Sequence, residues 1–119
     1  MPSAADEITA AIAAAGGAIP FSEYMQLALY GQGGFYTTSG RAGRRGGDFI
    51  TSPEVGPLFG TVIARALDAW WKELGSPSRF DVVECGAGPG TLARSILAAQ
   101  PECADAMHYV AVEISASQR

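Results

Sequence analysis

Three glycines at alternate positions directly follow a short apolar run over residues 80–84: Gly86, Gly88 and Gly90. Glycine adopts left-handed backbone conformations at little cost, so this spacing lets the chain turn sharply off a strand and lets a ligand approach the backbone. Residues 91–99 then carry apolar positions at helical spacing, and residues 109–113 form a second apolar run. Strand, glycine turn, helix and strand predict a βαβ unit, which requires a parallel sheet.

An acidic residue ends each predicted strand, Glu84 on the first and Glu113 on the second. Open α/β sheets bind ligands at the carboxyl ends of their strands, where a carboxylate can accept both hydroxyls of a ribose. A dinucleotide fingerprint, G-x-G-x-x-G, would require glycine where the chain has Thr91 or Ala93. A tight turn without a ligand would explain the glycines but not the two acids. The pattern therefore favours a ribose-containing cofactor other than a dinucleotide.

The arrangement E-x-G-x-G-x-G resembles motif I of the class I methyltransferases, which use S-adenosyl-L-methionine. In that family the acid heading the motif lies near the amino-acid end of the cofactor, the glycine loop passes under it, and the second acid holds the ribose. The resemblance implies cofactor-binding roles for six residues: Glu84, Gly86, Ala87, Gly88, Gly90 and Glu113.

A second motif, G-D-F-I-T-S-P-E-V over residues 47–55, lies upstream, after F-S-E-Y-M at 21–25 and G-F-Y at 34–36. This order is similar to the MidA family, methyltransferases whose mitochondrial relative assists assembly of respiratory complex I. The resemblance implies an arginine side chain of a partner protein as methyl acceptor, with a respiratory-complex subunit as one candidate partner.

In the MidA family the region around residues 47–55 abuts the cofactor pocket, which implies cofactor contacts for Thr51, Ser52 and Pro53. Two carboxylates in the same segment, Asp48 and Glu54, are candidate catalytic residues, because either could hold a guanidinium and orient its nitrogen. A plainer account is helix entry, in which Ser52 caps the next helix and Glu54 favours its positive end. Both accounts can hold together.

Residues 1–78 are expected to form a helical extension. Ser3 is placed to cap a first helix that ends at Gly16, and Ser22 to cap a second that stops at Gly31. A Gly-rich loop follows to Gly47. The apolar stripe over residues 57–74 predicts a third helix, with the stripe buried in the core.

The expected architecture is α/β: the start of a Rossmann-like class I methyltransferase sheet, preceded by the helical extension. Residues 79–119 would supply only the first βαβ unit of the methyltransferase domain, so we expect the chain to be truncated after the second strand. Two parallel strands cannot bury both faces of a sheet. We therefore expect these 119 residues alone to have little activity.

Composition narrows the function further. A net charge of -4 argues against a nucleic-acid partner, and the one basic run is expected to be a solvated loop or a local patch: Arg41, Arg44 and Arg45. Two cysteines with this spacing and one histidine predict neither a disulfide framework nor a metal site. Cys85 is expected to be a small buried residue.

No apolar run is long enough to cross a bilayer. The first residues carry Asp6 and Glu7 and no Lys or Arg, so a leader is not expected and a cytoplasmic location is. Two alternative functions remain open. One is a nicotinamide- or flavin-dependent oxidoreductase, and the other is a non-catalytic assembly factor that retains the methyltransferase fold.

Overall fold

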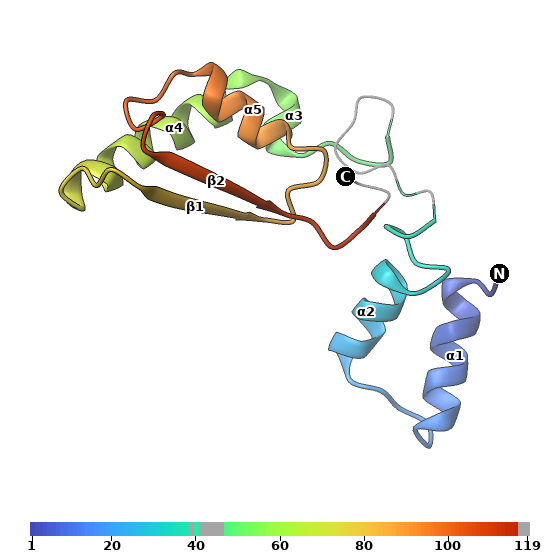
Figure 1. Ribbon diagram of the computed structural model, residues 1–119. Coiled ribbons are helices and arrows are strands. Elements are labelled where there is room, and N and C mark those ends of the chain that lie inside the picture. The colour runs from blue at the N-terminus through green and yellow to red at the C-terminus, as the bar shows by residue number, and fades with distance from the viewer. Residues whose placement is uncertain (39, 41–46, 117–119) are drawn as a thin grey trace.

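The computed structural model describes residues 1–38, 40 and 47–116 (Figure 1). Its elements in chain order are α1 (Ala4–Ala14), α2 (Phe21–Tyr30), α3 (Ser52–Val55), α4 (Pro57–Glu73), β1 (Phe80–Cys85), α5 (Thr91–Ala98) and β2 (Met107–Val112). Within the described residues β1 and β2 pair in parallel and the helical extension precedes them, so the predicted α/β class is confirmed. The basic residues Arg41, Arg44 and Arg45 fall outside the described residues.

Helix α1 begins where the sequence predicts. The Ser3 hydroxyl accepts from the Asp6 backbone N–H at 3.2 Å, and the Asp6 carboxylate accepts from the Ser3 backbone N–H at 3.0 Å. This reciprocal capping box satisfies two N–H groups that a helix start otherwise leaves unpaired. Hydrogen bonds from the Ser3 hydroxyl, at 2.7 Å, and from the Ser3 backbone N–H lower the pKa of the Asp6 carboxyl.

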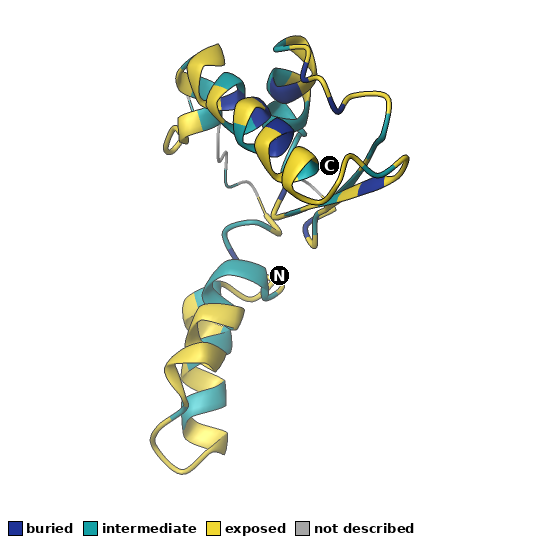
Figure 2. Cartoon of the chain, turned by 90° about the vertical axis from the view of Figure 1, so that its left-hand side faces the viewer, coloured by how far each residue is buried: buried dark blue, intermediate teal, exposed yellow. Residues whose placement is uncertain are grey.

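Helix α2 begins two residues earlier than predicted. The prediction that Ser22 caps it is wrong, because the N-cap residue is Pro20 and the helix starts at Phe21. Proline at φ -59° already has the backbone angle that a helix start needs. Glu7 links α1 to the turn after α2, because its carboxylate accepts from the backbone N–H of Gly33 at 2.6 Å. Neither helix has a buried residue, and Figure 2 shows both in teal and yellow only.

The core lies between α4, α5 and the sheet. Its buried members are Ala64, Leu67, Phe80, Ile96 and Cys103. Helices α4 and α5 approach closely at Gly60, where an added Cβ would lie 2.8 Å from the Ser95 carbonyl carbon and closer still to its side chain. Glycine at this position therefore sets how near the two helices pack.

The prediction that the whole α4 stripe is core is only partly right. Leu58 is 75% exposed and Trp70 is 53% exposed, and Val62 and Leu74 are exposed as well. Periodicity identifies the apolar side of a helix but not how much of that side has a partner. Here α5 and the sheet cover only the strip that includes Ala64 and Leu67.

Asp68 is a buried carboxylate on α4. Its Oδ1 accepts from the backbone N–H of Cys103 at 3.0 Å, and its Oδ2 lies 3.4 Å from Arg65 Nη1. Burial disfavours the charged form, but the Cys103 N–H and the Arg65 charge outweigh it, so the pKa of Asp68 is lowered. This contact fastens the segment before β2 to α4.

The two strands run in register from the pair Phe80–Met107 to the pair Cys85–Val112. Side chains alternate between the faces, and the helices cover the face that carries Phe80 and Val82. On the other face Val83 is 60% exposed, and Cys85 is exposed too. The prediction of a buried Cys85 is therefore wrong, because nothing in the described chain covers that face.

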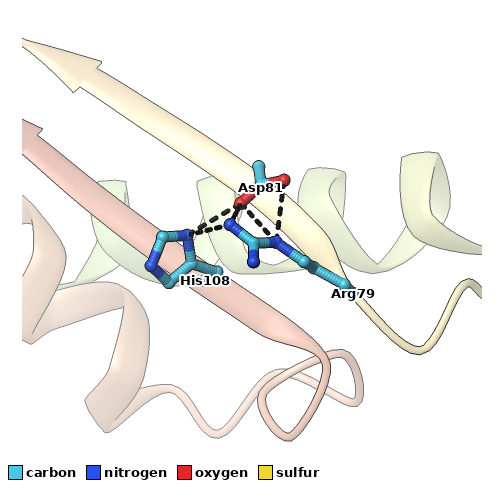
Figure 3. Close-up of polar contacts among 3 residues, drawn as sticks. All are labelled: Arg79, Asp81 and His108. Atoms are coloured by element: carbon cyan, nitrogen blue, oxygen red, sulfur yellow. Dashed lines mark hydrogen bonds and ion pairs between the residues drawn. The ribbon is translucent and has the colours of Figure 1, made fainter.

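Polar residues on the open face link the strands (Figure 3). Asp81 lies directly opposite His108 in the register, with Oδ1 2.7 Å from His108 Nδ1 and 3.0 Å from Arg79 Nη2. Hydrogen bonding from Arg79, and then from His108, lowers the pKa of Asp81. Exposed ion pairs contribute little stability, so the cluster mainly favours this register over a shifted one.

The division into 1–78 and 79–119 remains a proposal about sequence organisation. In packing, α4 shares one core with β1 and α5, although it precedes the proposed boundary. Helices α1 and α2 pack on each other and stand apart from that core (Figure 1). Within the described residues, no helix combines the length and the apolar character that a bilayer span requires.

Candidate cofactor site

The glycine loop between β1 and α5 turns through left-handed backbone angles, with φ +71° at Gly86 and +53° at Gly88. A Cβ added at either position would meet no atom within 4 Å. Crowding therefore does not exclude side chains here. The backbone angles favour glycine, and the space above the loop stays open for a ligand.

Hydrogen bonds fix this loop to the end of β2. The carbonyl of Val112 accepts from the backbone N–H groups of Gly86 at 2.8 Å and Ala87 at 3.1 Å. The carboxylate of Glu113 accepts from the N–H of Gly88 at 2.9 Å through Oε2 and from the N–H of Ser115 at 2.7 Å through Oε1. The glycine loop and the Glu113 carboxylate thus form one connected unit at the carboxyl end of the sheet.

A cleft of about 580 Å³ opens between the loop and the end of β2, lined by Ala87, Gly88, Pro89, Gly90, Ala111, Val112 and Glu113. Four of the predicted cofactor-binding residues therefore line one cavity. A larger groove of about 720 Å³ runs along α3 and α4, but mostly apolar side chains line it. A ribose needs hydrogen-bonding groups, so we take the cleft at the glycine loop as the candidate site.

Glu84, the acid that heads the motif, is the penultimate residue of β1. Its side chain is half-buried, and its Oε2 accepts a hydrogen bond from the Tyr109 hydroxyl at 2.8 Å. Glu84 is not among the residues that line the cleft. It lies two residues before Gly86, where the loop begins to turn.

The upstream motif lies on α3 and the segment leading into it, and α3 packs against α4 and α5. Asp48, Thr51 and Ser52 are exposed, whereas Pro53 and Glu54 are half-buried. None of these five appears among the described residues lining the glycine-loop cleft, and Ser52 lines the α3–α4 groove. Their roles stay predictions.

One hydrogen bond supports the interpretation that this segment forms the start of a helix. The N-cap residue of α3 is Thr51 rather than Ser52, and its hydroxyl donates to the Glu54 carboxylate. The prediction that Ser52 caps is therefore wrong by one position. Glu54 sits in the first turn, where a negative charge is favourable.

Sequence reasoning missed the residues that brace the site. Ser115 is buried, and its hydroxyl donates to the Tyr36 carbonyl at 2.6 Å, which joins the segment after α2 to the end of β2. Burial, together with Tyr30 and the charge of Glu113, raises the pKa of Tyr36. Only the fold brings these distant segments together. Tyr109 carried a weak signal, since a buried tyrosine usually directs its hydroxyl to a partner.

The described residues bring together no group of three or more His, Cys, Asp or Glu side chains that could hold a metal ion.

Residues 62–119 match a family model described as S-adenosyl-L-methionine-dependent methyltransferase. This match covers the glycine loop, Glu84 and Glu113, and the upstream motif adds the G-D-F-I-T-S-P-E pattern. The chain belongs to the MidA family of S-adenosylmethionine-dependent methyltransferases. The predicted cofactor is therefore the cofactor of the family. The open space above Gly86 and Gly88, beside the Glu113 carboxylate, fits it.

The names of curated relatives of this MidA-family chain state a specific activity. The chain is 48% identical over 82 residues to the fruit fly (Drosophila melanogaster) "Protein arginine methyltransferase NDUFAF7 homolog, mitochondrial". It is 38% identical over 82 residues to the human (Homo sapiens) "Protein arginine methyltransferase NDUFAF7, mitochondrial". Each match covers 68% of this chain and 18% of the relative, so the chain spans about a fifth of their length.

A solved structure supports the same fold. The crystal structure of an uncharacterized protein from Burkholderia thailandensis superposes with a TM-score of 0.71 at 36% sequence identity. The match covers 98% of this chain and 28% of that one. Helical extension and βαβ unit therefore both occur in the similar structure.

The expected cytoplasmic location is wrong by this comparison, because the matched curated relatives are mitochondrial by name. The expectation rested on two early acids, Asp6 and Glu7. The structure explains both locally, since Asp6 completes the cap of α1 and Glu7 accepts from Gly33. Their charges reflect helix capping and packing, and they carry no information about the compartment.

Proposed function

We propose that the whole protein transfers a methyl group from S-adenosylmethionine to an arginine side chain of a protein substrate. The observation that carries the proposal is the Glu113 carboxylate, held at the edge of the glycine-loop cleft by the Gly88 N–H at 2.9 Å. The names of the fruit fly and human relatives support the arginine acceptor. A respiratory-complex subunit is the candidate partner from the family resemblance.

Each candidate residue has a distinct task in this proposal. Glu113 accepts the ribose hydroxyls, the loop from Gly86 to Gly90 carries the cofactor against its backbone, and Glu84 holds the ammonium of the methionine part. Thr51, Ser52 and Pro53 complete the wall of the site. Asp48 or Glu54 pairs with the guanidinium and directs one nitrogen toward the methyl group.

The bound cofactor supplies an electrophilic methyl group on a sulfonium. Transfer would form a new N–C bond at the acceptor and break the C–S bond, S-adenosylhomocysteine would leave as the neutral thioether, and the acceptor nitrogen would lose one proton. This reaction depends mainly on positioning, so residues that orient the acceptor should affect the rate more than residues that only hold the cofactor.

The test is incorporation of labelled methyl groups by the whole protein. The substrate is a partner protein rich in arginine, and the same partner with every arginine replaced by lysine is the control. We expect label in the first substrate, recovered as methylarginine, and none in the control. Cofactor binding without incorporation into any arginine would support the non-catalytic assembly factor instead. Label in the lysine control would refute the arginine assignment.

A further inference from the structure

Tyr109 and Glu84 face each other on the helix-covered side of the sheet. The register pairs Tyr109 with Val82, so Glu84 is the next residue of β1 on the same face, toward the glycine loop. The Tyr109 hydroxyl donates to Glu84 Oε2 at 2.8 Å. The long Tyr109 side chain reaches this diagonal neighbour, and the bond joins the two strands just before the loop.

Packing holds the ring of Tyr109 in place. Its ring contacts the core cluster that includes Phe80 and Ile96. Burial, and then the hydrogen bond and charge of Glu84, raise the pKa of Tyr109 well above its ordinary value. The phenol therefore keeps its proton at neutral pH and acts only as a donor toward the carboxylate.

Glu84 is arranged asymmetrically by this contact. Its Oε2 takes the phenol, whereas Oε1 makes no hydrogen bond to any of the described residues. A glutamate at a strand end has several rotatable bonds, and fixing them beforehand removes an entropic cost from ligand binding. One oxygen is thus anchored while the other stays available to a cationic group.

We propose that Tyr109 is the positioning residue for Glu84, and that its hydroxyl orients this carboxylate toward the ammonium of the methionine part of the cofactor. The inference rests on the proposed function, which puts the methionine part at Glu84. It goes further by assigning a task to a residue outside the glycine motif and outside the cleft lining.

Two ligands separate this role from a merely structural one. S-adenosylhomocysteine carries the amino-acid part, and 5′-methylthioadenosine has the same adenosine and thioether without it. In the whole protein, Tyr109→Phe keeps the ring and its packing and removes only the hydroxyl. By calorimetry we expect the Kd of S-adenosylhomocysteine to rise about five- to tenfold, as loss of roughly one hydrogen bond allows. The Kd of 5′-methylthioadenosine should stay unchanged.

A second background tests the coupling directly. In a Glu84→Gln protein the carboxylate is already lost, so adding Tyr109→Phe should produce little further loss of affinity for S-adenosylhomocysteine. Equal weakening of both ligands by Tyr109→Phe, or unchanged affinity for S-adenosylhomocysteine, would overturn the positioning role and leave the proposed function intact. A wild-type protein that binds neither ligand would overturn both proposals.

Discussion

The backbone N–H of Gly88 donates to the Glu113 carboxylate at 2.9 Å, which links the glycine loop to the residue that follows β2. The N–H of Ser115 donates to the other carboxylate oxygen at 2.7 Å. Both bonds come from backbone groups, so they hold the carboxylate whichever side chains surround it. The loop and the Glu113 carboxylate, which we propose binds the ribose, are therefore held in place together before any cofactor binds.

Replacing Glu113 by Ala should weaken binding of S-adenosylhomocysteine by roughly 1–3 kcal/mol, the range for hydrogen bonds to a charged group. It should also loosen the loop, because the Gly88 N–H loses its acceptor. Calorimetry measures the affinity, and hydrogen exchange at Gly88 measures the loosening. Glu73→Ala removes an exposed acid from α4, away from the cleft, and should change neither. Wild-type affinity in the Glu113 variant would remove this residue from the ribose site.

Gly60→Ala should destabilise the protein by about 1–3 kcal/mol, because the new methyl group would overlap Ser95 and push α4 and α5 apart. Denaturant unfolding of the whole protein measures the loss. Adding Ser95→Ala should restore part of it, since the Ser95 hydroxyl is one of the atoms in the overlap. Affinity for S-adenosylhomocysteine per folded molecule should remain normal. An unfolding free energy equal to that of the wild type would show that the helices can separate at little cost.

Much of this fold could be predicted because short sequence patterns determine where its helices and strands begin and end. Ser3 and the alternating glycines gave the start of α1 and the turn after β1, and apolar spacing placed α4, β1 and β2 to within a few residues. Ser22 misled because serine is a good cap, yet Pro20 already supplied the backbone angle of a helix start. Cap preferences cannot rank two candidates two residues apart without the geometry of the preceding chain.

Contacts between residues far apart in sequence could not be predicted from these local sequence patterns. The stripe on α4 gave the correct face but not its exposure, which depends on how much of it other elements cover. Asp68 pairing with the Cys103 N–H, and Tyr109 with Glu84, join residues far apart in sequence. Of the candidate site, the glycine loop with Glu113 followed from spacing on two parallel strands, whereas its bracing by Ser115 depended on the fold.

Asp68→Asn tests the buried contact with Cys103. The pKa of Asp68 is lowered in the folded protein from its ordinary value of 3.8. Its contribution to stability is therefore full above that value, and it is lost as the pH falls below it through the folded pKa. We expect the variant to lose about 1–3 kcal/mol near pH 7, where the charged acceptor is replaced by an amide.

Unfolding curves at pH 7 and pH 3 check the sign of this effect. The gap in stability between wild type and Asp68→Asn should narrow at the lower pH, because the Asp68 carboxylate of the unfolded chain takes up a proton before that of the folded protein does, which favours unfolding of the wild type. A gap that widens on acidification would contradict the lowered pKa.

Glu54→Gln separates acceptor recognition from helix entry. If Glu54 holds the arginine acceptor, the loss of charge should lower methyl transfer about tenfold or more while affinity for S-adenosylhomocysteine stays close to wild type. If its task is only to favour the start of α3, the variant should lose about 0.3–1 kcal/mol of stability and keep its turnover per folded molecule. Label incorporation and calorimetry on the same preparation distinguish the two, and Asp48→Asn is the parallel test of the other carboxylate.

The central claim is that the glycine loop and Glu113 form a site for S-adenosylmethionine. Calorimetric titration of the whole protein with S-adenosylmethionine, S-adenosylhomocysteine and NAD tests it most directly. We expect saturable binding of the first two, weakened by Glu113→Ala, and markedly weaker binding of NAD, because Thr91 replaces a glycine of the dinucleotide fingerprint. Tighter binding of NAD than of either S-adenosyl compound would contradict the account and favour the oxidoreductase alternative.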